Sequence, residues 1–262
     1  MPRLLLINPN TSGSVSDLLQ SHAQRVAGPG HTVHTVTARF GAPYIACEAS
    51  YAVAGHAVLD AWAHSVVDYP AQKGTAGQGW DALLIACFGD PGLFALRESA
   101  DVPVTGLAEA AFREAALLGR FAIVTGGERW GPMLQRLAHA LGFGDQICGI
   151  HTVTQSGAEL ARDPVAAQTL LTTACQAAVQ RFSAQAVILG GAGLAGMAAR
   201  VAPAVDVPVI DSVEAGVRHA LSIAKAPRVC ASPRATQPVF DFSWTNMSPA
   251  LTALGASPLA CV

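Results

Sequence analysis

The sequence contains an internal repeat, and this repeat limits the folds open to the chain more than any other feature. The apolar run Ala82–Cys87 has a counterpart in Ala186–Gly191, which begins 104 residues later (186 − 82 = 104). Downstream, the segment Asp-Val-Pro-Val occurs at Asp101–Val104 and again at Asp206–Val209, an offset of 105 (206 − 101 = 105). Matches that recur in the same order at nearly the same offset indicate a duplicated unit rather than chance similarity between buried strands.

A third match extends the repeat toward the N-terminus. Arg3–Asn8 resembles Arg120–Thr125, because each is an Arg followed by a short apolar run and a polar residue. Short apolar runs alternate with longer amphipathic stretches, which is the pattern of parallel strands covered by helices. The sequence therefore predicts an α/β protein with two pseudo-symmetric lobes, each a short parallel sheet flanked by helices, and an active-site cleft between them.

The same patterns predict where the elements lie. The expected strands are Leu4–Ile7, Thr32–Val36, Ala82–Ala86, Val102–Thr105, Phe121–Thr125, Gln146–His151, Ala186–Leu189 and Val207–Ile210. The expected helices are Ser14–Val26, Ala49–Val67, Leu107–Leu118, Pro132–Leu141, Val165–Phe182 and Val213–Ile223. We expect residues 1–104 and 209–230 to form lobe one, 105–208 to form lobe two, and 231–262 to form an irregular C-terminal tail, with a surface loop at Gly74–Gly79.

Composition excludes several classes of partner. Charged residues make up 13% of the chain, the net charge is −2 and Lys and Arg are scattered, which argues against nucleic acid or an anionic membrane. The apolar runs are far shorter than the ~20 residues of a membrane span. So low a charge content indicates surface buried in a homo-oligomer.

Cysteine usage bears on location and on metals. The N-terminus shows no export signal, so we expect a cytoplasmic protein in which the six cysteines are free thiols. None of them forms a CxxC pair, and no His/Cys cluster has zinc spacing, so no metal is expected.

The strongest candidate for chemistry is the segment Ala86–Gly92, Ala-Cys-Phe-Gly-Asp-Pro-Gly. It follows an apolar strand and is expected to open a helix, with Pro91 in the first turn. Cys87 would then meet backbone amides and the positive end of a helix, which stabilise a thiolate, so we expect it to be the most reactive thiol. Phe88 and Gly89 lie in the same turn and are predicted to contact the ligand.

Further turns after strands carry candidate binding residues, because ligands of parallel sheets bind at the carboxyl ends of the strands. In Ile7–Gly13, Thr11 or Ser12 can cap the next helix, and the free amides can hold a carboxylate or an imide oxygen. The glycine-rich turns Val124–Gly127 and Leu189–Gly193 let backbone amides approach a ligand closely. The residues predicted to bind substrate from these turns, and from the end of the last strand, are Asn10, Thr11, Thr125, Gly126, Gly191, Ala192 and Asp211.

These motifs resemble those of the hydantoin and allantoin racemases, which belong to the aspartate/glutamate racemase superfamily. The resemblance rests on Asn-Pro-Asn-Thr-Ser near the start, on Ala-Cys-Phe-Gly-Asp-Pro-Gly, and on Val-Thr-Gly-Leu-Ala-Glu-Ala-Ala after it, and it covers Arg3 to Ala224. It implies a cofactor-independent isomerase in which two cysteines act on opposite faces of a carbon acid. Cys87 matches the first cysteine. The second position reads Gly-Cys-Ala-Gly in the family and Gly-Gly-Ala-Gly here, so Gly191 replaces the second cysteine.

The replacement at Gly191 leaves three functions open. The first is a racemase or epimerase that uses Cys87 and a substitute second base on a 5-substituted hydantoin, allantoin or an amino-acid-like carbon acid. The second is a one-thiol decarboxylase or isomerase of the same superfamily, and the third is a non-catalytic protein that binds a small ligand.

Few other residues are candidates for the second base. Water, Cys47 or Asp211 is available for it, although Cys47 also fits an ordinary loop thiol and Asp211 a helix cap. His56 and His64 have helical spacing and are expected to face outward or to pack. No motif supports the remaining cysteines, Cys148, Cys175, Cys230 and Cys261.

Overall fold

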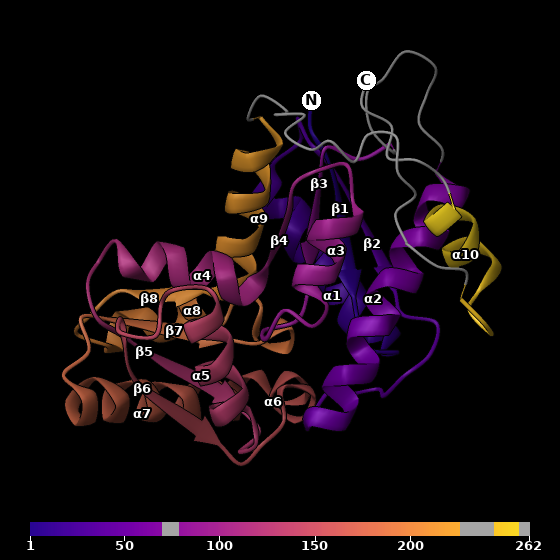
Figure 1. Cartoon of the computed structure of the whole chain (residues 1–262). Helices are drawn as coiled ribbons and strands as arrows, with labels where there is room; N and C mark the ends of the chain where they lie inside the picture. Colours follow the sequence, from indigo (N-terminus) through magenta and orange to yellow (C-terminus); the bar gives the residue numbers. More distant parts are fainter. Residues whose placement is uncertain (70–78, 226–243, 257–262) are drawn as a thin grey trace.

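Two parallel four-stranded sheets form the centres of two lobes (Figure 1). The structure, a computed structural model, describes residues 1–69, 79–225 and 244–256. Sheet one has the strand order β2-β1-β3-β4 and sheet two the order β6-β5-β7-β8, so the two sheets share one topology. The strands are β1 (Arg3–Asn8), β2 (Thr32–Thr37), β3 (Ala82–Ile85), β4 (Val104–Gly106), β5 (Phe121–Gly126), β6 (Ile147–Val153), β7 (Ala186–Gly190) and β8 (Val209–Asp211). The predicted α/β fold and all eight predicted strands are confirmed.

Helices cover the faces of both sheets. The longer ones are α1 (Gly13–Ala27), α2 (Glu48–Asp68), α4 (Leu107–Ala116), α5 (Trp130–Ala140), α7 (Pro164–Phe182) and α9 (Ser212–Ala224), which confirm the six predicted helices. Helix α3 (Leu93–Ser99) is the helix expected to follow the Cys87 turn, although it begins after Pro91. The sequence patterns did not indicate the short helices α6 (Gly157–Arg162) and α8 (Ala198–Val201). None of the helices in the described part of the chain combines the length and the apolar character needed to cross a membrane.

The expected C-terminal tail is not irregular throughout. Residues Pro249–Ala256 form the helix α10, which packs on α2 of lobe one. Leu251 and Leu254 are buried there, and this apolar contact provides the free energy that orders the helix. Residues 231–243 and 257–262 of the tail and residues 74–78 of the expected loop lie outside the described residues.

The helix that follows the fourth strand of each sheet packs on the other sheet. Helix α4 follows β4 of sheet one but packs on β7 and β8 of sheet two, whereas α9 follows β8 and packs on β3 and β4 of sheet one (Figure 1). The chain therefore crosses between lobes after the fourth strand of each sheet. The expected boundaries at 104/105 and 208/209 are each a few residues early, because β4 extends to Gly106 and β8 pairs with β7.

The core explains why the central strands β1, β3, β5 and β7 are apolar over most of their length. On β1, Leu4 and Leu6 contribute to a core shared by both lobes, whereas Leu5 and Ile7 point to the opposite face of the sheet, into a second cluster with α2 and α3. Successive residues of a strand face opposite sides, and both sides are covered here. The shared core continues through Phe121 and Ile188 of sheet two, so one apolar body joins the lobes.

Candidate active site

A small cavity lies at the carboxyl ends of β1, β3, β5 and β7, between the two lobes. Its volume is about 60 Å³, which suits a compact ligand. Seven of the ten predicted site residues line it: Asn10, Cys87, Phe88, Thr125, Gly126, Gly191 and Ala192. They meet because all four strands are parallel and central in their sheets, so the turns that follow them lie at the same edge.

The turn after β1 is held by its own side-chain amides. The Asn8 Nδ2 atom donates to Ser16 Oγ at 2.9 Å and to Asn10 Oδ1 at 3.0 Å. Asn10 Oδ1 also accepts from the Ser12 backbone N–H at 2.9 Å, which leaves the Asn10 amide nitrogen as the group that can meet a ligand.

Neither hydroxyl of this turn acts as predicted. The Thr11 backbone N–H donates to Ala42 O, and Thr11 does not line the cavity. Ser12 is the N-cap residue of α1, but its side chain makes no capping bond. The hydrogen bonds of the two asparagines hold this turn, so a hydroxyl cap is not needed.

Cys87 lines the cavity, but its electrostatic environment is opposite to the expected one. The residue is 9% exposed, and its burial, with the nearby Asp90 carboxyl, raises the pKa of the thiol. The expectation of a lowered pKa assumed that the Cys87 turn leads directly into a helix with Pro91 in its first turn. Helix α3 starts only at Leu93, after the left-handed Gly92, so its dipole does not stabilise a thiolate at residue 87.

Asp90 connects the cysteine turn to the crossing helix α4. Its carboxylate accepts the backbone N–H groups of Ala108 at 2.9 Å and Glu109 at 2.7 Å, both in the first turn of α4. Burial nevertheless raises the pKa of Asp90 to about 7. The turn that carries Cys87 is thus fixed by a carboxyl group that titrates near neutral pH.

Gly190 and Gly191 shape the wall that faces Cys87. A Cβ atom at Gly190 would overlap the Phe88 ring, so this glycine lets an aromatic side chain of lobe one pack on sheet two. Gly191 has φ 148° and ψ 135°, a backbone conformation that residues with a Cβ atom rarely adopt. Its backbone N–H donates to Ser212 Oγ at 3.2 Å. The position that carries a cysteine in the family is thus built around a glycine backbone.

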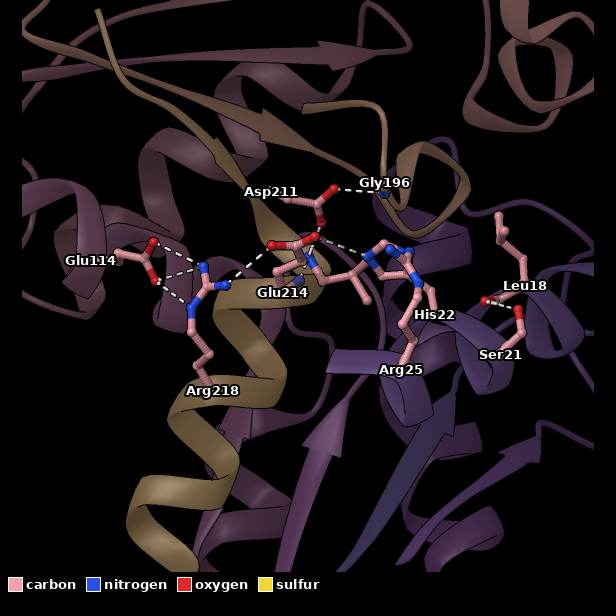
Figure 2. Close-up of polar contacts among 10 residues, drawn as sticks. Leu18, Ser21, His22, Arg25, Glu114, Gly196, Asp211, Glu214 and Arg218 are labelled. Carbon is pink, nitrogen blue, oxygen red and sulfur yellow. Dashed lines mark hydrogen bonds and ion pairs between the residues drawn. The ribbon is translucent and has the colours of Figure 1, made fainter. Parts of the chain in front are cut away.

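Asp211 does not line the cavity and serves as a helix cap. Its Oδ1 accepts the N–H groups of Val213 and Glu214 in α9, and its Oδ2 accepts the N–H of Gly196 at 2.7 Å (Figure 2). Burial raises the pKa of this carboxyl. Gly89 is likewise outside the cavity, because its carbonyl accepts the Tyr51 hydroxyl at 2.7 Å and the Trp130 ring packs against it.

His22, Asp211 and Glu214 are the one group among the described residues close enough to share a metal ion. The His22 Nε2 lies 3.5 Å from Glu214 Oε1 (Figure 2). The Arg25 guanidinium contacts His22 Nδ1 and can only donate, so Nδ1 accepts and Nε2 carries the ring proton. The group thus combines one imidazole and two carboxyl groups with the Arg25 guanidinium beside the imidazole.

Two aromatic residues of the cavity have no signal in the sequence. Tyr44, in the loop between β2 and α2, extends its hydroxyl across the cleft to Gly126 O at 3.2 Å. Trp130 opens α5 and lines the same wall. The other lining residues that the motifs did not indicate are Val15, Pro43, Ile45, Gly157 and Leu194.

The other side chains considered from the sequence lie elsewhere. Cys47 is the N-cap of α2 and does not line the cavity. His56 packs against Phe40, and His64 contacts Arg39 and the carbonyl of Asp60.

Comparison with known proteins identifies the protein family and its fold. Residues 4–220 match the model of the Asp/Glu/hydantoin racemase family. The chain belongs to this family. A hydantoin racemase of Pseudomonas sp. (strain NS671) is 32% identical over 84% of this chain and 85% of that protein.

Solved structures of two related proteins have the same fold. The allantoin racemase of Klebsiella pneumoniae superposes with a TM-score of 0.77 at 34% identity, covering 85% of this chain and 87% of that one. Arylmalonate decarboxylase, at 19% identity and a TM-score of 0.58 over 86% of this chain and 93% of that one, shares the fold. The hydantoin and allantoin relatives are racemases and hence isomerases, in agreement with the class of enzyme predicted from the sequence.

Proposed function

We propose that this protein racemises a small cyclic carbon acid, a 5-substituted hydantoin or allantoin, without a cofactor, and that Cys87 exchanges the proton on one face. The observation that carries the proposal is the position of Cys87 in a cavity formed by the turns after β1, β3, β5 and β7. Among the described cysteines it alone lines that cavity. The similarity to hydantoin and allantoin racemases supports the same class of substrate.

The lining favours a neutral imide over an acidic amino acid. No charged side chain lines the cavity in the described part of the chain, and its walls include Val15, Ile45 and Leu194. An acidic amino acid brings two carboxylates and an ammonium group, and burying these charges without partners is costly. A hydantoin brings two carbonyls and two N–H groups, which the Asn10 amide and the backbone of the glycine-rich turns can satisfy.

The raised pKa of Cys87 has a consequence for the chemistry. At rest the residue is a thiol, and when it ionises it is a stronger base than an ordinary cysteine. Removal of the C5 proton leaves an enolate on the adjacent carbonyl, and oriented N–H groups stabilise that charge. The Asn10 amide and the backbone N–H groups of the turns around Gly126 and Gly191 supply such donors.

Proton exchange at C5 in D2O tests this function directly. With enantiopure 5-substituted hydantoins and NMR detection, the native protein should exchange the C5 proton and racemise the substrate. Cys87→Ala should slow exchange by about 10²–10⁴-fold, the usual contribution of a general acid–base group. Cys148→Ala is the matched control, because this half-buried thiol lies on β6 outside the cavity and should leave exchange unchanged.

The absence of a side chain at Gly191 keeps a one-thiol decarboxylase or isomerase as a second candidate. Such an enzyme would exchange one enantiomer only and retain its configuration. A protein that binds hydantoins, shown by a rise in its melting temperature, without exchanging either enantiomer would be the non-catalytic alternative.

A further inference from the structure

Racemisation needs a proton donor on the face opposite Cys87, and the wall of lobe two that forms this face has no thiol. Gly191 occupies the corresponding position, and its φ of 148° disfavours any side chain there. Of the two side chains considered from the sequence, Asp211 points away from the cavity to cap α9, and Cys47 caps α2 outside the cavity. This leaves water, the third candidate from the sequence, or another residue that lines the cavity as the proton donor.

Tyr44 places a hydroxyl on this wall although it belongs to lobe one. It donates to Gly126 O at 3.2 Å, and Trp130 and Gly157 lie near enough to lower the pKa of the hydroxyl. All three residues belong to lobe two. Gly127 has no side chain, and a Cβ there would lie 2.9 Å from the hydroxyl oxygen.

The strand register brings the Tyr44 hydroxyl to the wall that includes Gly191. Thr125 of β5 pairs with Gly190, the last residue of β7, so Gly126 and Gly191 each come directly after this pair. Tyr44, which hydrogen-bonds to Gly126 O, lines the same cavity as Gly191 and Cys87.

We propose that Tyr44 is the second acid–base residue, which exchanges a proton with the face of the substrate opposite Cys87. The proposal rests on the racemase function above. The Cys87 thiolate takes the C5 proton, and the C–H electron pair moves into the enolate. Tyr44 then gives its O–H proton to the other face of C5, which leaves a Cys87 thiol and a tyrosinate. The other enantiomer uses the same steps in reverse, and between turnovers solvent water returns the proton from the Cys87 thiol to the tyrosinate, so no co-reactant is consumed.

The charges at the site support a mechanism in which Cys87 and Tyr44 hold the proton in turn. Burial raises the pKa of Tyr44, Trp130 and Gly157 act in the opposite direction, and a charge on Cys87 raises the pKa again. A thiolate at Cys87 therefore keeps the proton on Tyr44, while Trp130 and Gly157 stabilise the tyrosinate once the proton has left. One proton shared between two groups is what a two-base racemase requires.

A purely structural role for Tyr44, as a latch that holds the lobes together, differs from this one in stereochemistry. Tyr44→Phe keeps the ring and removes the hydroxyl. In D2O, we expect this variant to lose racemisation by at least about 10²-fold, and to lose exchange of the enantiomer whose C5 proton faces Tyr44 by a similar factor. The enantiomer whose proton faces Cys87 should still exchange, with retention of configuration. Cys87→Ser should show the opposite preference between enantiomers.

Tyr51→Phe is the matched control, because it removes another tyrosine hydroxyl bonded to a carbonyl, that of Gly89, from a residue outside the cavity. It should leave the ratio of the two exchange rates unchanged. If Tyr44→Phe does not fold, Trp130→Phe removes the indole group that lowers the pKa of the Tyr44 hydroxyl and should shift the same ratio toward the enantiomer that faces Cys87.

The outcomes separate the two proposals. A native protein that racemises, with a folded Tyr44→Phe variant that exchanges both enantiomers at native or equally reduced rates, overturns the role of Tyr44 alone. A native protein that exchanges neither enantiomer of any hydantoin overturns the racemase function, and the role of Tyr44 with it.

Discussion

Cys47 and Cys87 show how local environment decides the reactivity of a thiol. Cys47 is partly exposed at the start of α2, and the Ser50 hydroxyl and backbone N–H groups lower its pKa. Cys87 is buried, and burial raises its pKa. Cys47 has the larger fraction of thiolate and is more accessible to a reagent, so it should react faster than Cys87. The sequence motif had predicted the opposite order.

We therefore expect iodoacetamide at pH 7 to modify Cys47 at least about tenfold faster than Cys87. Peptide mapping after brief labelling measures the two rates, and Cys47→Ala should remove the fast reaction without exposing Cys87. Faster labelling of Cys87 in the native protein would show that the cavity opens and that the thiol is activated in solution.

Asp90 makes stability depend on pH near neutrality. Its folded pKa of about 7 lies above the ordinary value of 3.8, so folding favours the protonated carboxyl. This contribution is complete below pH 3.8 and is lost as the pH rises toward 7, by up to about 1.4 kcal/mol for each pH unit.

Asp90→Asn keeps one of the two side-chain oxygens that accept the N–H groups of α4, and it cannot ionise. The variant should therefore become more stable relative to the native protein between pH 5 and pH 8, by about 1–3 kcal/mol. Urea midpoints at the two pH values measure this difference. Asp163→Asn, at the exposed cap of α7, is the control and should show no such dependence. Equal pH dependence in native and Asp90→Asn proteins would mean that Asp90 is ionised throughout.

The way in which a site residue reaches the cavity determines whether the sequence could predict it. Cys87, Thr125 and Gly191 lie at or just after strand ends, so locating the parallel strands was enough to place them together. Tyr44 reaches the cavity from a loop whose path depends on contacts with the other lobe, and no local pattern encodes such contacts. Asp211 ends a strand as well, but capping α9 turns its side chain away from the ligand.

At the level of elements, the buried strands were the most predictable part. Each is an apolar run bounded by turns, because both faces of both sheets are covered. The short helices α6 and α8 span too few residues for an apolar period to be visible, and α10 depends on packing against α2. Tertiary contacts determine these three elements, and a local sequence pattern does not contain such contacts.

The caps of α7 and α9 offer a matched test of burial. Asp163 and Asp211 each accept two backbone N–H groups at a helix start, but Asp163 is exposed, whereas Asp211 is buried and also accepts the Gly196 N–H. Asp163→Ala should cost about 1 kcal/mol of stability, as a typical N-cap does. Asp211→Ala should cost about 2–4 kcal/mol, because it also leaves a donor of the 191–196 turn unsatisfied. Urea unfolding measures both values, and equal costs would show that the bond to Gly196 adds nothing.

At the scale of the molecule, the exchanged helices and the shared core make the two lobes interdependent. Phe112 of α4 is fully buried and lies 6.1 Å from the Phe88 ring of lobe one and 5.8 Å from the Phe121 ring of sheet two, measured between ring centroids. If one lobe unfolds, the shared core becomes exposed and the other lobe loses the helix that packs on it. A duplicated sequence has thus produced one cooperative unit rather than two domains.

This interdependence predicts that damage to one lobe melts both at the same temperature. Leu171 of α7 is fully buried in the outer core of lobe two, a cluster separate from the core that the exchanged helices share. Leu171→Ala should cost about 2–5 kcal/mol and lower the melting temperature by about 5–15 °C. In a Trp130→Phe background, the buried tryptophans of the described chain are Trp62 and Trp80, both in lobe one, so fluorescence reports on that lobe while far-UV circular dichroism reports on the whole. The two signals should shift together, because loss of lobe two removes α4 and the core beneath it. A fluorescence transition that keeps its original midpoint while the dichroism transition moves would show that lobe one folds on its own.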